Sequence, residues 1–419
     1  MDDPSPQVVQ RPDPGVLSKP VENDVRSRMS ELSWEAVATG VLAAVVGFTG
    51  SFAVVLQGLR AAGASEAEAT SGLIALSVGM GISGVVLAVR YRMPIGVAWS
   101  TPGAALLITS GESLSSINEA IGAYLFSAIL LVLAGWFRPL GRLIESIPAS
   151  LANAMLAGVL LSICLAPVKA LAIDATLALP LLLTWWIVGR YNRYFAVPAA
   201  LLVLAPLVVW RLGLPENFTD QLQTSLIPQI QFIMPAFSAQ ALISIGIPLF
   251  VVTMASQNVP GVAVLRAAGY RPKAGPLIIN TGSFSLVTAP LGAHGINLAA
   301  ITAAMFCSED AHVNPQRRYW AAITAGVTYV VLGLLAGAAV LCLTLVPTEL
   351  IEAIAGLALL GSFSAAIVAA LADIKQREAA AITFLFSGSG LAFLGVGGAF
   401  WGLLVGGFMV MTVNYRRSR

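Results

Sequence analysis

Apolar residues occur in runs of about 20 along most of the chain, separated by short turns that contain charged residues, proline or glycine. A helix needs roughly 20 apolar residues to cross the hydrocarbon core of a bilayer. Residues 1–33 differ, because they are polar and rich in proline, with no apolar core that precedes a cleavage site. The pattern therefore predicts an all-α polytopic membrane protein that follows a disordered tail at residues 1–33.

We expect fourteen membrane segments, seven on each side of an external polar linker at residues 214–236. The first set lies within residues 34–213 and comprises 36–58, 68–89, 94–110, 117–137, 148–168, 175–189 and 195–213. The second set lies within residues 237–415 and comprises 237–256, 275–289, 290–307, 319–346, 349–371, 379–394 and 397–414.

The distribution of basic residues supports this arrangement. With the N-terminus in the cytoplasm, 20 of the 23 Lys and Arg residues fall on the cytoplasmic side, and only Arg60, Lys169 and Arg211 fall outside. Basic residues favour cytoplasmic loops. If one span were missed or added, every later loop would be assigned to the wrong side, and the excess of basic residues on one side would be lost. Both termini are therefore expected in the cytoplasm.

The composition narrows the function classes. The chain is 57% hydrophobic, has a mean hydropathy of +0.84 and is only 11% charged, which excludes an ordinary cytosolic enzyme and a disordered chain. A net charge of +2 does not indicate a nucleic-acid partner. The three cysteines lie in apolar stretches without metal-type spacing, so we expect no disulfide, metal or cofactor.

Short repeats relate the two halves. The pentapeptide LRAAG follows the first span at residues 59–63 and the eighth at 265–269, on opposite sides of the membrane by the topology above. The tetrapeptides PIGV at 94–97 and PLGA at 290–293 open the third segment of each half. Their order favours an inverted seven-plus-seven repeat, as in many transporters.

Both third segments carry helix breakers, which predict a short extended stretch and then a half-helix of about 10 residues. Thr101 is a good N-cap before Pro102, and Asn297 is the matching cap, each seven residues after the opening proline. The two N-termini would meet near the midplane with their positive dipole ends. The alternative is that proline and glycine merely kink continuous helices.

No Asp, Glu, Lys or Arg lies in the middle of a predicted span. A bound anion would then be held by the helix ends and by hydroxyl or amide groups, with aromatic rings nearby for an apolar ring. Each aromatic residue alone is better explained by packing. The candidate substrate-binding residues are Ser100, Thr101, Gln257, Asn258, Gly295, Asn297, Phe48, Phe52 and Trp99.

His294 is the one histidine predicted near the midplane, and histidine changes its charge near neutral pH. It is a candidate for proton coupling, and a neutral imidazole bonded to the backbone is the equal alternative. His312 is expected in an exposed cytoplasmic loop.

Two glycine patterns fit helix packing better than cofactor binding. Residues 79–84 match G-x-G-x-x-G, but they lie inside a span with no preceding strand. Gly398, Gly402 and Gly406 predict a tight helix contact within the fold or with a second subunit. Common zinc, serine and aspartyl motifs are missing, so we expect no enzyme and no catalytic residue. A passive channel stays an alternative.

The segments PIGVAWSTPGAALL and PLGAHGINLAAITAAM, together with MASQNVPGVAVLRAAGY after the eighth span, resemble the bacterial benzoate/proton symporter family from Trp34 onward. More distantly, the plan is similar to nucleobase and sulfate permeases of the seven-plus-seven type. The resemblance implies a substrate-carrying core domain of residues 34–137 plus 237–346. It also implies a gate domain, often dimeric, of residues 138–213 plus 347–415.

The resemblance further implies a carrier in the bacterial inner membrane that imports benzoate with a proton. Nucleobase relatives carry acidic residues at the eighth and tenth spans, where this chain has Gln257, Asn258, His294, Gly295 and Asn297. The difference favours an aromatic carboxylate, which a fixed carboxylate would repel. Transport of another small anion or a nucleobase, and a passive anion channel, are the alternatives.

Overall fold

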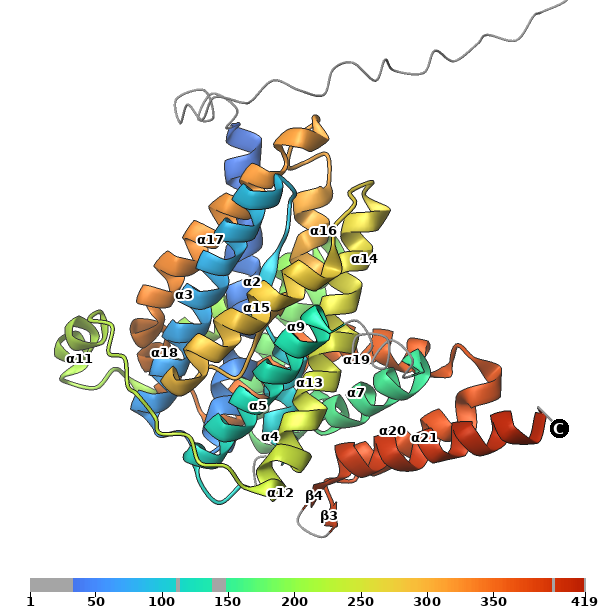
Figure 1. The fold of residues 1–419 in the computed structure, drawn as a ribbon. Helices are drawn as coiled ribbons and strands as arrows, with labels where there is room; N and C mark the ends of the chain where they lie inside the picture. Colours follow the sequence, from blue (N-terminus) through green and yellow to red (C-terminus); the bar gives the residue numbers. More distant parts are fainter. Residues whose placement is uncertain (1–32, 111–113, 138–147, 394–395, 418–419) are drawn as a thin grey trace, which may run out of the picture. The chain divides into compact units, whose positions relative to one another are not determined.

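The computed structural model describes residues 33–110, 114–137, 148–393 and 396–417. The expected disordered tail therefore lies outside the described residues apart from Ser33, which accepts a hydrogen bond from the Ala36 N–H at 3.2 Å and caps the first helix. In the described part helices dominate, and two short antiparallel strand pairs accompany them (Figure 1).

The elements of the first half, up to the linker, are α2 (Trp34–Ala61), α3 (Glu66–Tyr91), β1 (Val97–Trp99), α4 (Thr101–Ser110), α5 (Ile117–Trp136), α7 (Ala149–Cys164), α8 (Ala166–Ile173), α9 (Ala175–Tyr191), η3 (Arg193–Phe195) and α10 (Ala196–Leu212). The linker contains one short helix, α11 (Phe218–Ser225).

The second half begins with one long helical segment made of α12 (Ala239–Ala241), η4 (Leu242–Gly246), α13 (Ile247–Thr253), η5 (Met254–Asn258) and α14 (Val259–Ala267). It continues with α15 (Ala274–Thr288), η6 (Ala289–Leu291), β2 (Ile296–Leu298), α16 (Ile301–Cys307), η7 (Pro315–Arg317), α17 (Tyr319–Leu334), α18 (Ala336–Thr344), α19 (Thr348–Leu371), η8 (Ile374–Gln376), α20 (Arg377–Gly388), β3 (Ala392–Phe393), β4 (Val396–Gly397) and α21 (Gly398–Arg417).

Among the described residues, seven helical stretches are long and apolar enough to cross a bilayer. The pair Pro315–Leu334 and Ala336–Thr344, bent by 54°, makes eight if it counts as one span. Other expected segments form shorter helices, such as α9 with 17 residues and α15 with 15. The count of fourteen therefore stays a prediction.

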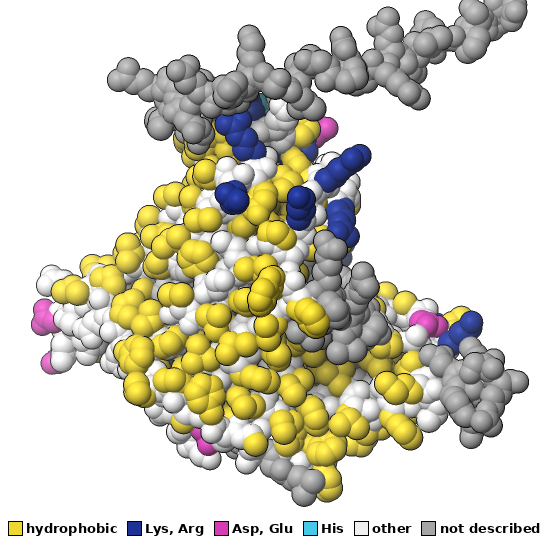
Figure 2. Space-filling model, viewed as in Figure 1, with side chains coloured by type: hydrophobic (Ala, Val, Ile, Leu, Met, Phe, Trp, Pro, Cys, Tyr) yellow, Lys and Arg dark blue, Asp and Glu magenta, His cyan; other side chains and the backbone are white. Residues whose placement is uncertain are grey.

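The helices pack in two sets. In the first, α2 and α3 lie against α17, and α5 lies against α15; in the second, α7 lies against α19 and α20, and α20 lies against α21 (Figure 1). On the face shown in Figure 2, hydrophobic side chains cover the middle of the helices, and Lys and Arg gather near the end at which α2 begins.

The repeated LRAAG pentapeptide forms the same helix end in both halves. Gly63 at the end of α2 has φ +91°, and Gly269 at the end of α14 has φ +88°. The N–H of Ala64 donates to the Leu59 carbonyl at 3.1 Å, and the N–H of Tyr270 donates to the Leu265 carbonyl at 3.0 Å. Each glycine takes the left-handed conformation that closes this kind of C-terminal cap. The sequence repeat is therefore a structural repeat.

The two glycine patterns are packing contacts, as expected. A Cβ at Gly81 would clash with the backbone carbonyl of Gly326, and a Cβ at Gly326 would lie 2.6 Å from the Gly81 carbonyl, so α3 and α17 touch at their backbones. In α21, Gly402 faces α20, where a Cβ would lie 2.7 Å from the Thr383 carbonyl oxygen. The contact of α21 is thus made within the fold.

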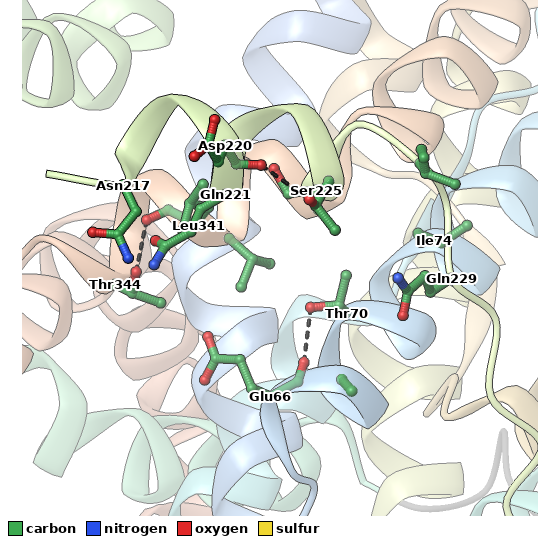
Figure 3. A pocket seen from close by; sticks show the side chains of 15 residues that line it. Glu66, Thr70, Ile74, Asn217, Asp220, Gln221, Ser225, Gln229, Leu341 and Thr344 are labelled. Atoms are coloured by element: carbon green, nitrogen blue, oxygen red, sulfur yellow. Dashed lines mark hydrogen bonds between the residues drawn. The ribbon is translucent and has the colours of Figure 1, made fainter. Parts of the chain in front are cut away.

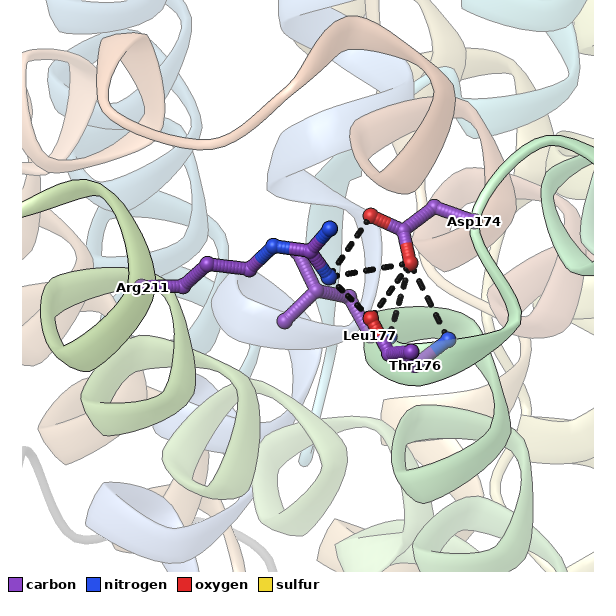
Figure 4. A network of polar contacts seen from close by, with 4 residues as sticks. All are labelled: Asp174, Thr176, Leu177 and Arg211. Atoms are coloured by element: carbon purple, nitrogen blue, oxygen red, sulfur yellow. Dashed lines mark hydrogen bonds and ion pairs between the residues drawn. The ribbon is translucent and has the colours of Figure 1, made fainter.

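A polar network joins α9 and α10 at the turn after α8 (Figure 4). The Asp174 carboxylate accepts hydrogen bonds from the Thr176 hydroxyl at 2.6 Å and from the Thr176 N–H at 3.0 Å, and it pairs with Arg211 at 3.1 Å. The Thr176 hydroxyl bond is the main cause that lowers the pKa of Asp174, and the Leu177 N–H and the Arg211 charge lower it further.

Because the pKa of Asp174 is lower in the folded protein, its stabilising effect is present above the unfolded value of about 3.9. The effect is lost as the pH falls through the lower, folded-state pKa. We expect Asp174→Asn to lower the unfolding temperature at neutral pH, and the difference from wild type to shrink at acid pH. Melting curves across a pH series test this, with Asp220→Asn on α11 as control. An equal deficit at every pH would contradict the prediction.

Candidate functional site

The two broken segments meet as an antiparallel strand pair. Val97 pairs with Leu298, Ala98 with Asn297, and Trp99 with Ile296. The pairing extends on both sides, because the Ser100 N–H donates to the Gly295 carbonyl at 3.1 Å and the Ala299 N–H donates to the Gly96 carbonyl at 2.9 Å. We call residues 96–101 and 294–299 the crossing. These hydrogen bonds pair the backbone N–H and C=O groups of two stretches that are not helical, and such groups are costly to leave unpaired inside a membrane protein.

The first half-helix begins one residue earlier than its predicted cap requires. Ser100, not Thr101, is the N-cap of α4, since its hydroxyl accepts from the Gly103 N–H at 3.1 Å. Thr101 is the first helical residue, half-buried, and Pro102 follows with no N–H. Among the first-turn amides, the Thr101 N–H is the one for which the described residues supply no acceptor. The expected N-cap role of Thr101 is therefore wrong.

The expected N-cap role of Asn297 is also wrong. Asn297 lies in β2, and α16 begins at Ile301 with Ala300 as its N-cap. The two prolines are not equivalent, because Pro290 lies in the 3₁₀ turn η6, which Gly292 ends at φ +97°. That turn shifts β2 and α16 relative to their counterparts. α16 has only seven residues, so the predicted pair of equal half-helices is not what the structure contains.

Two asparagines hold the crossing in place. The Leu298 N–H donates to Asn258 Oδ1 at 3.0 Å, and Asn297 Nδ2 donates to the Leu298 carbonyl at 3.0 Å. Asn258 belongs to η5, a π-helical turn, and both asparagines are fully buried. The candidate residues Asn258 and Asn297 therefore meet at one residue, Leu298.

Two hydroxyl groups at the crossing were not predicted. Thr253 Oγ1 lies 3.0 Å from Ser100 Oγ, and Ser285 Oγ accepts from the Ile296 N–H at 2.8 Å. Neither residue belongs to a motif. A single hydroxyl residue in an apolar helix is common, so the sequence did not single out either one.

The π turns do have a signal in the sequence. η4 and η5 each end two residues before a proline, Pro248 and Pro260, within a single long helix. A proline inside a helix lacks the N–H for the fourth carbonyl before it and clashes with that carbonyl. A π turn relieves the clash and is common at functional sites. In η5 it places Asn258 against the crossing, while Gln257 is half-buried and makes no hydrogen bond to the described residues of the crossing.

His294 is buried at the crossing with 2% of its surface exposed. Its Nε2 lies 2.8 Å from the Ser100 carbonyl oxygen. A carbonyl only accepts, so Nε2 carries the proton of the neutral ring and Nδ1 presents its lone pair. No described residue is bonded to Nδ1. The groups hydrogen-bonded at the crossing include no Asp, Glu, Lys or Arg among the described residues.

The three aromatic candidates form one cluster, in which Phe48 and Phe52 of α2 lie beside Trp99 of the crossing. Phe48 packs against Phe52 with ring centroids 5.0 Å apart and against Trp99 at 5.3 Å. Trp99 Nε1 donates to Ser51 Oγ at 2.8 Å, which fixes the indole against α2. Phe48 and Phe52 also line an apolar cavity of about 230 Å³ between α2, α10 and α18.

Two larger cavities lie elsewhere. One of about 590 Å³ lies between α3, α11 and α18, where Figure 3 shows Glu66 and Thr70 across from Asn217 and Gln221 of the linker helix. The other, of about 510 Å³, lies between α2 and α4 on one side and α7, α8, α19 and α20 on the other. None of the candidate substrate residues lines either cavity.

Residues 30–412 match a family model described as "Benzoate membrane transport protein". The chain belongs to the benzoate membrane transport protein family. It is 38% identical to "Inner membrane protein YdcO" of Escherichia coli over 94% of this chain and 99% of the relative. It is 34% identical to "Benzoate membrane transport protein" of Acinetobacter baylyi over 91% and 96%. The family assignment made from the motifs is confirmed, and the chain is a multi-pass membrane transport protein.

Two solved structures share the fold at 13% sequence identity. The transmembrane domain of the cyanobacterial bicarbonate transporter BicA matches with a TM-score of 0.55 over 91% of this chain and 97% of that one. SLC26A9 matches with a TM-score of 0.58 over 94% of this chain and 68% of that one. At this identity the likeness concerns the fold alone.

Proposed function

We propose that the protein imports benzoate, or a closely related aromatic carboxylate, with a proton across a bacterial inner membrane, both termini being cytoplasmic. The observation that carries the proposal is a buried, uncharged polar crossing beside an aromatic cluster, in a chain of the benzoate membrane transport protein family. The name of the Acinetobacter baylyi relative supports the substrate.

The carboxylate would bind at the crossing and the ring against Phe48, Phe52 and Trp99. The Thr101 N–H at the start of α4 supplies one donor, and the helix dipole adds a favourable term of about 0.3–1 kcal/mol. Gln257 Nε2 and the second N–H of Asn297 Nδ2 would supply amide donors, since the first N–H of Asn297 Nδ2 holds the Leu298 carbonyl. With no fixed charge at the crossing, binding stays weak enough for release, as a carrier requires.

The two packing sets described above support a division into core and gate domains. The core would comprise residues 34–137 plus 237–346, and it would contain the crossing. The gate would comprise residues 138–213 plus 347–415. The cavity of about 510 Å³ lies along the boundary between them and supports movement of one set against the other. A dimer through the gate stays part of the proposal.

His294 is the proposed proton carrier. Its Nδ1 is buried and has no partner among the described residues, so an arriving proton has a lone pair to bind. The bond from Nε2 to the Ser100 carbonyl would then link the charge of the ring to the start of α4.

Uptake of radiolabelled benzoate into vesicles that contain the purified protein tests the function. We expect benzoate to accumulate when the outside is acidic, and accumulation to stop when a protonophore dissipates the gradient. Uptake of uracil, bicarbonate or sulfate with none of benzoate would contradict the proposed substrate. Equilibration without accumulation would favour the alternative of a passive anion channel.

A further inference from the structure

Three buried polar atoms without a hydrogen-bond partner lie in residues at or beside the crossing. They are the Tyr124 hydroxyl, His294 Nδ1 and Asn297 Oδ1, half of the six such atoms found among the described residues. Buried polar groups in proteins nearly always have partners, and leaving one unpaired costs about 1–3 kcal/mol. A concentration of unpaired groups at one place therefore points to a ligand.

Tyr124 is the member of this group that the sequence did not indicate. It lies on α5 and is 1% exposed, and its ring contacts the edge of the His294 ring with centroids 6.4 Å apart. The backbone of α5 lies close to η4, since a Cβ at Gly246 would be 3.3 Å from the Ala123 carbonyl oxygen. This close approach holds the neighbouring Tyr124 beside the crossing.

There is room for a small group at Gly295, the residue that precedes β2. A Cβ added at Gly295, next to His294, would meet nothing nearer than Ser100 Cβ at 4.0 Å. Gly295 is fixed by its carbonyl, which accepts from the Ser100 N–H. A small ligand group can therefore approach the backbone here without displacing a side chain.

We propose that the Tyr124 hydroxyl is a substrate contact that donates a hydrogen bond to the carboxylate of the transported aromatic acid. The inference rests on the proposed function, because it deepens the same site. A phenol is a neutral donor, and a hydrogen bond to an ionised oxygen is shorter and stronger than one between neutral groups. It suits a crossing whose hydrogen-bonded groups carry no fixed positive charge. The carboxylate would then supply the partner that the Tyr124 hydroxyl lacks among the described residues.

The test is Tyr124→Phe in the full chain, with binding of radiolabelled benzoate to the purified protein as the readout. We expect binding to weaken about tenfold or more. The unfolding temperature should stay the same or rise, since the variant removes an unpaired buried hydroxyl. Tyr329→Phe is the matched control, because Tyr329 is also buried at 3% exposure and its hydroxyl faces Gly47 of α2. It should bind benzoate as the wild type does.

The outcomes separate the two proposals. If the wild type binds no benzoate, the proposed substrate fails and this contact fails with it. If the wild type binds benzoate and Tyr124→Phe binds it equally well, the contact alone is overturned. A loss of binding matched by a lower unfolding temperature would also overturn it, because a structural role then explains both.

Discussion

His294→Gln is expected to abolish accumulation of benzoate driven by a pH gradient while leaving exchange of external for internal benzoate intact. Glutamine keeps an N–H that can donate to the Ser100 carbonyl, so the contact at 2.8 Å that joins the two broken segments survives. Its amide does not take up a proton near neutral pH, so the proposed coupling is lost. Uptake with and without a proton gradient, together with counterflow in the same vesicles, measures the two activities separately.

The chain offers a matched control, because it contains only two histidines. His312 lies in the loop between α16 and α17, where its Nδ1 accepts from the Asn314 N–H at 2.8 Å. His312→Gln should accumulate benzoate normally. If His294→Gln accumulates benzoate as the wild type does, its imidazole has the structural role that the sequence left open, and the proton enters elsewhere.

Gly81→Ala is expected to destabilise the protein by about 1–2 kcal/mol, even though alanine is the better helix former by about 1 kcal/mol. The added methyl group would meet the backbone carbonyl of Gly326, which cannot rotate away as a side chain could. Helices α3 and α17 must then move apart at this contact. The unfolding temperature of the purified protein in detergent measures the loss.

Gly84→Ala is the control for this change on the same helix. A Cβ at Gly84 would lie 3.7 Å from Val97 Cβ, an ordinary contact distance, so this variant should unfold at or slightly above the wild-type temperature. Equal unfolding temperatures for the two variants would show that the close contact at Gly81 does not limit stability.

The sequence predicted features that depend on local chemistry. The LRAAG repeats could be recognised because the same five residues follow the first and the eighth predicted spans, and the glycine of each copy takes the positive φ that ends a helix. The glycines of α21 could be read as contacts because their spacing places them on one face of a helix. Those of α3 could be read so because they lie inside a span with no preceding strand. The broken segments were visible because Pro and Gly interrupt an otherwise apolar run.

The exact register of the site could not be predicted. Ser100 and Thr101 are both good N-caps, and only the backbone conformation decides that Ser100 serves α4. Asn297 follows its proline at the same spacing as Thr101, but η6 and Gly292 use extra residues before β2 begins. Local sequence propensity does not predict these extra residues. They are needed for β2 to reach β1, which is a matter of tertiary structure.

Groups contributed by distant helices were the hardest to find. Thr253, Ser285 and Tyr124 reach the crossing from three different helices, and none belongs to a motif. Their positions follow from tertiary packing, for which one sequence gives no direct pattern.

The antiparallel crossing also constrains how the protein is made. Ser100 finds its partner at His294, which is synthesised 194 residues later. Until then, β1 has unpaired N–H and C=O groups, which are costly inside a bilayer. The first half therefore cannot complete its fold by itself, and Val97–Trp99 must stay hydrated or shielded by other helices until β2 is available. The last step of folding would thus join the two halves at the place where substrate is proposed to bind.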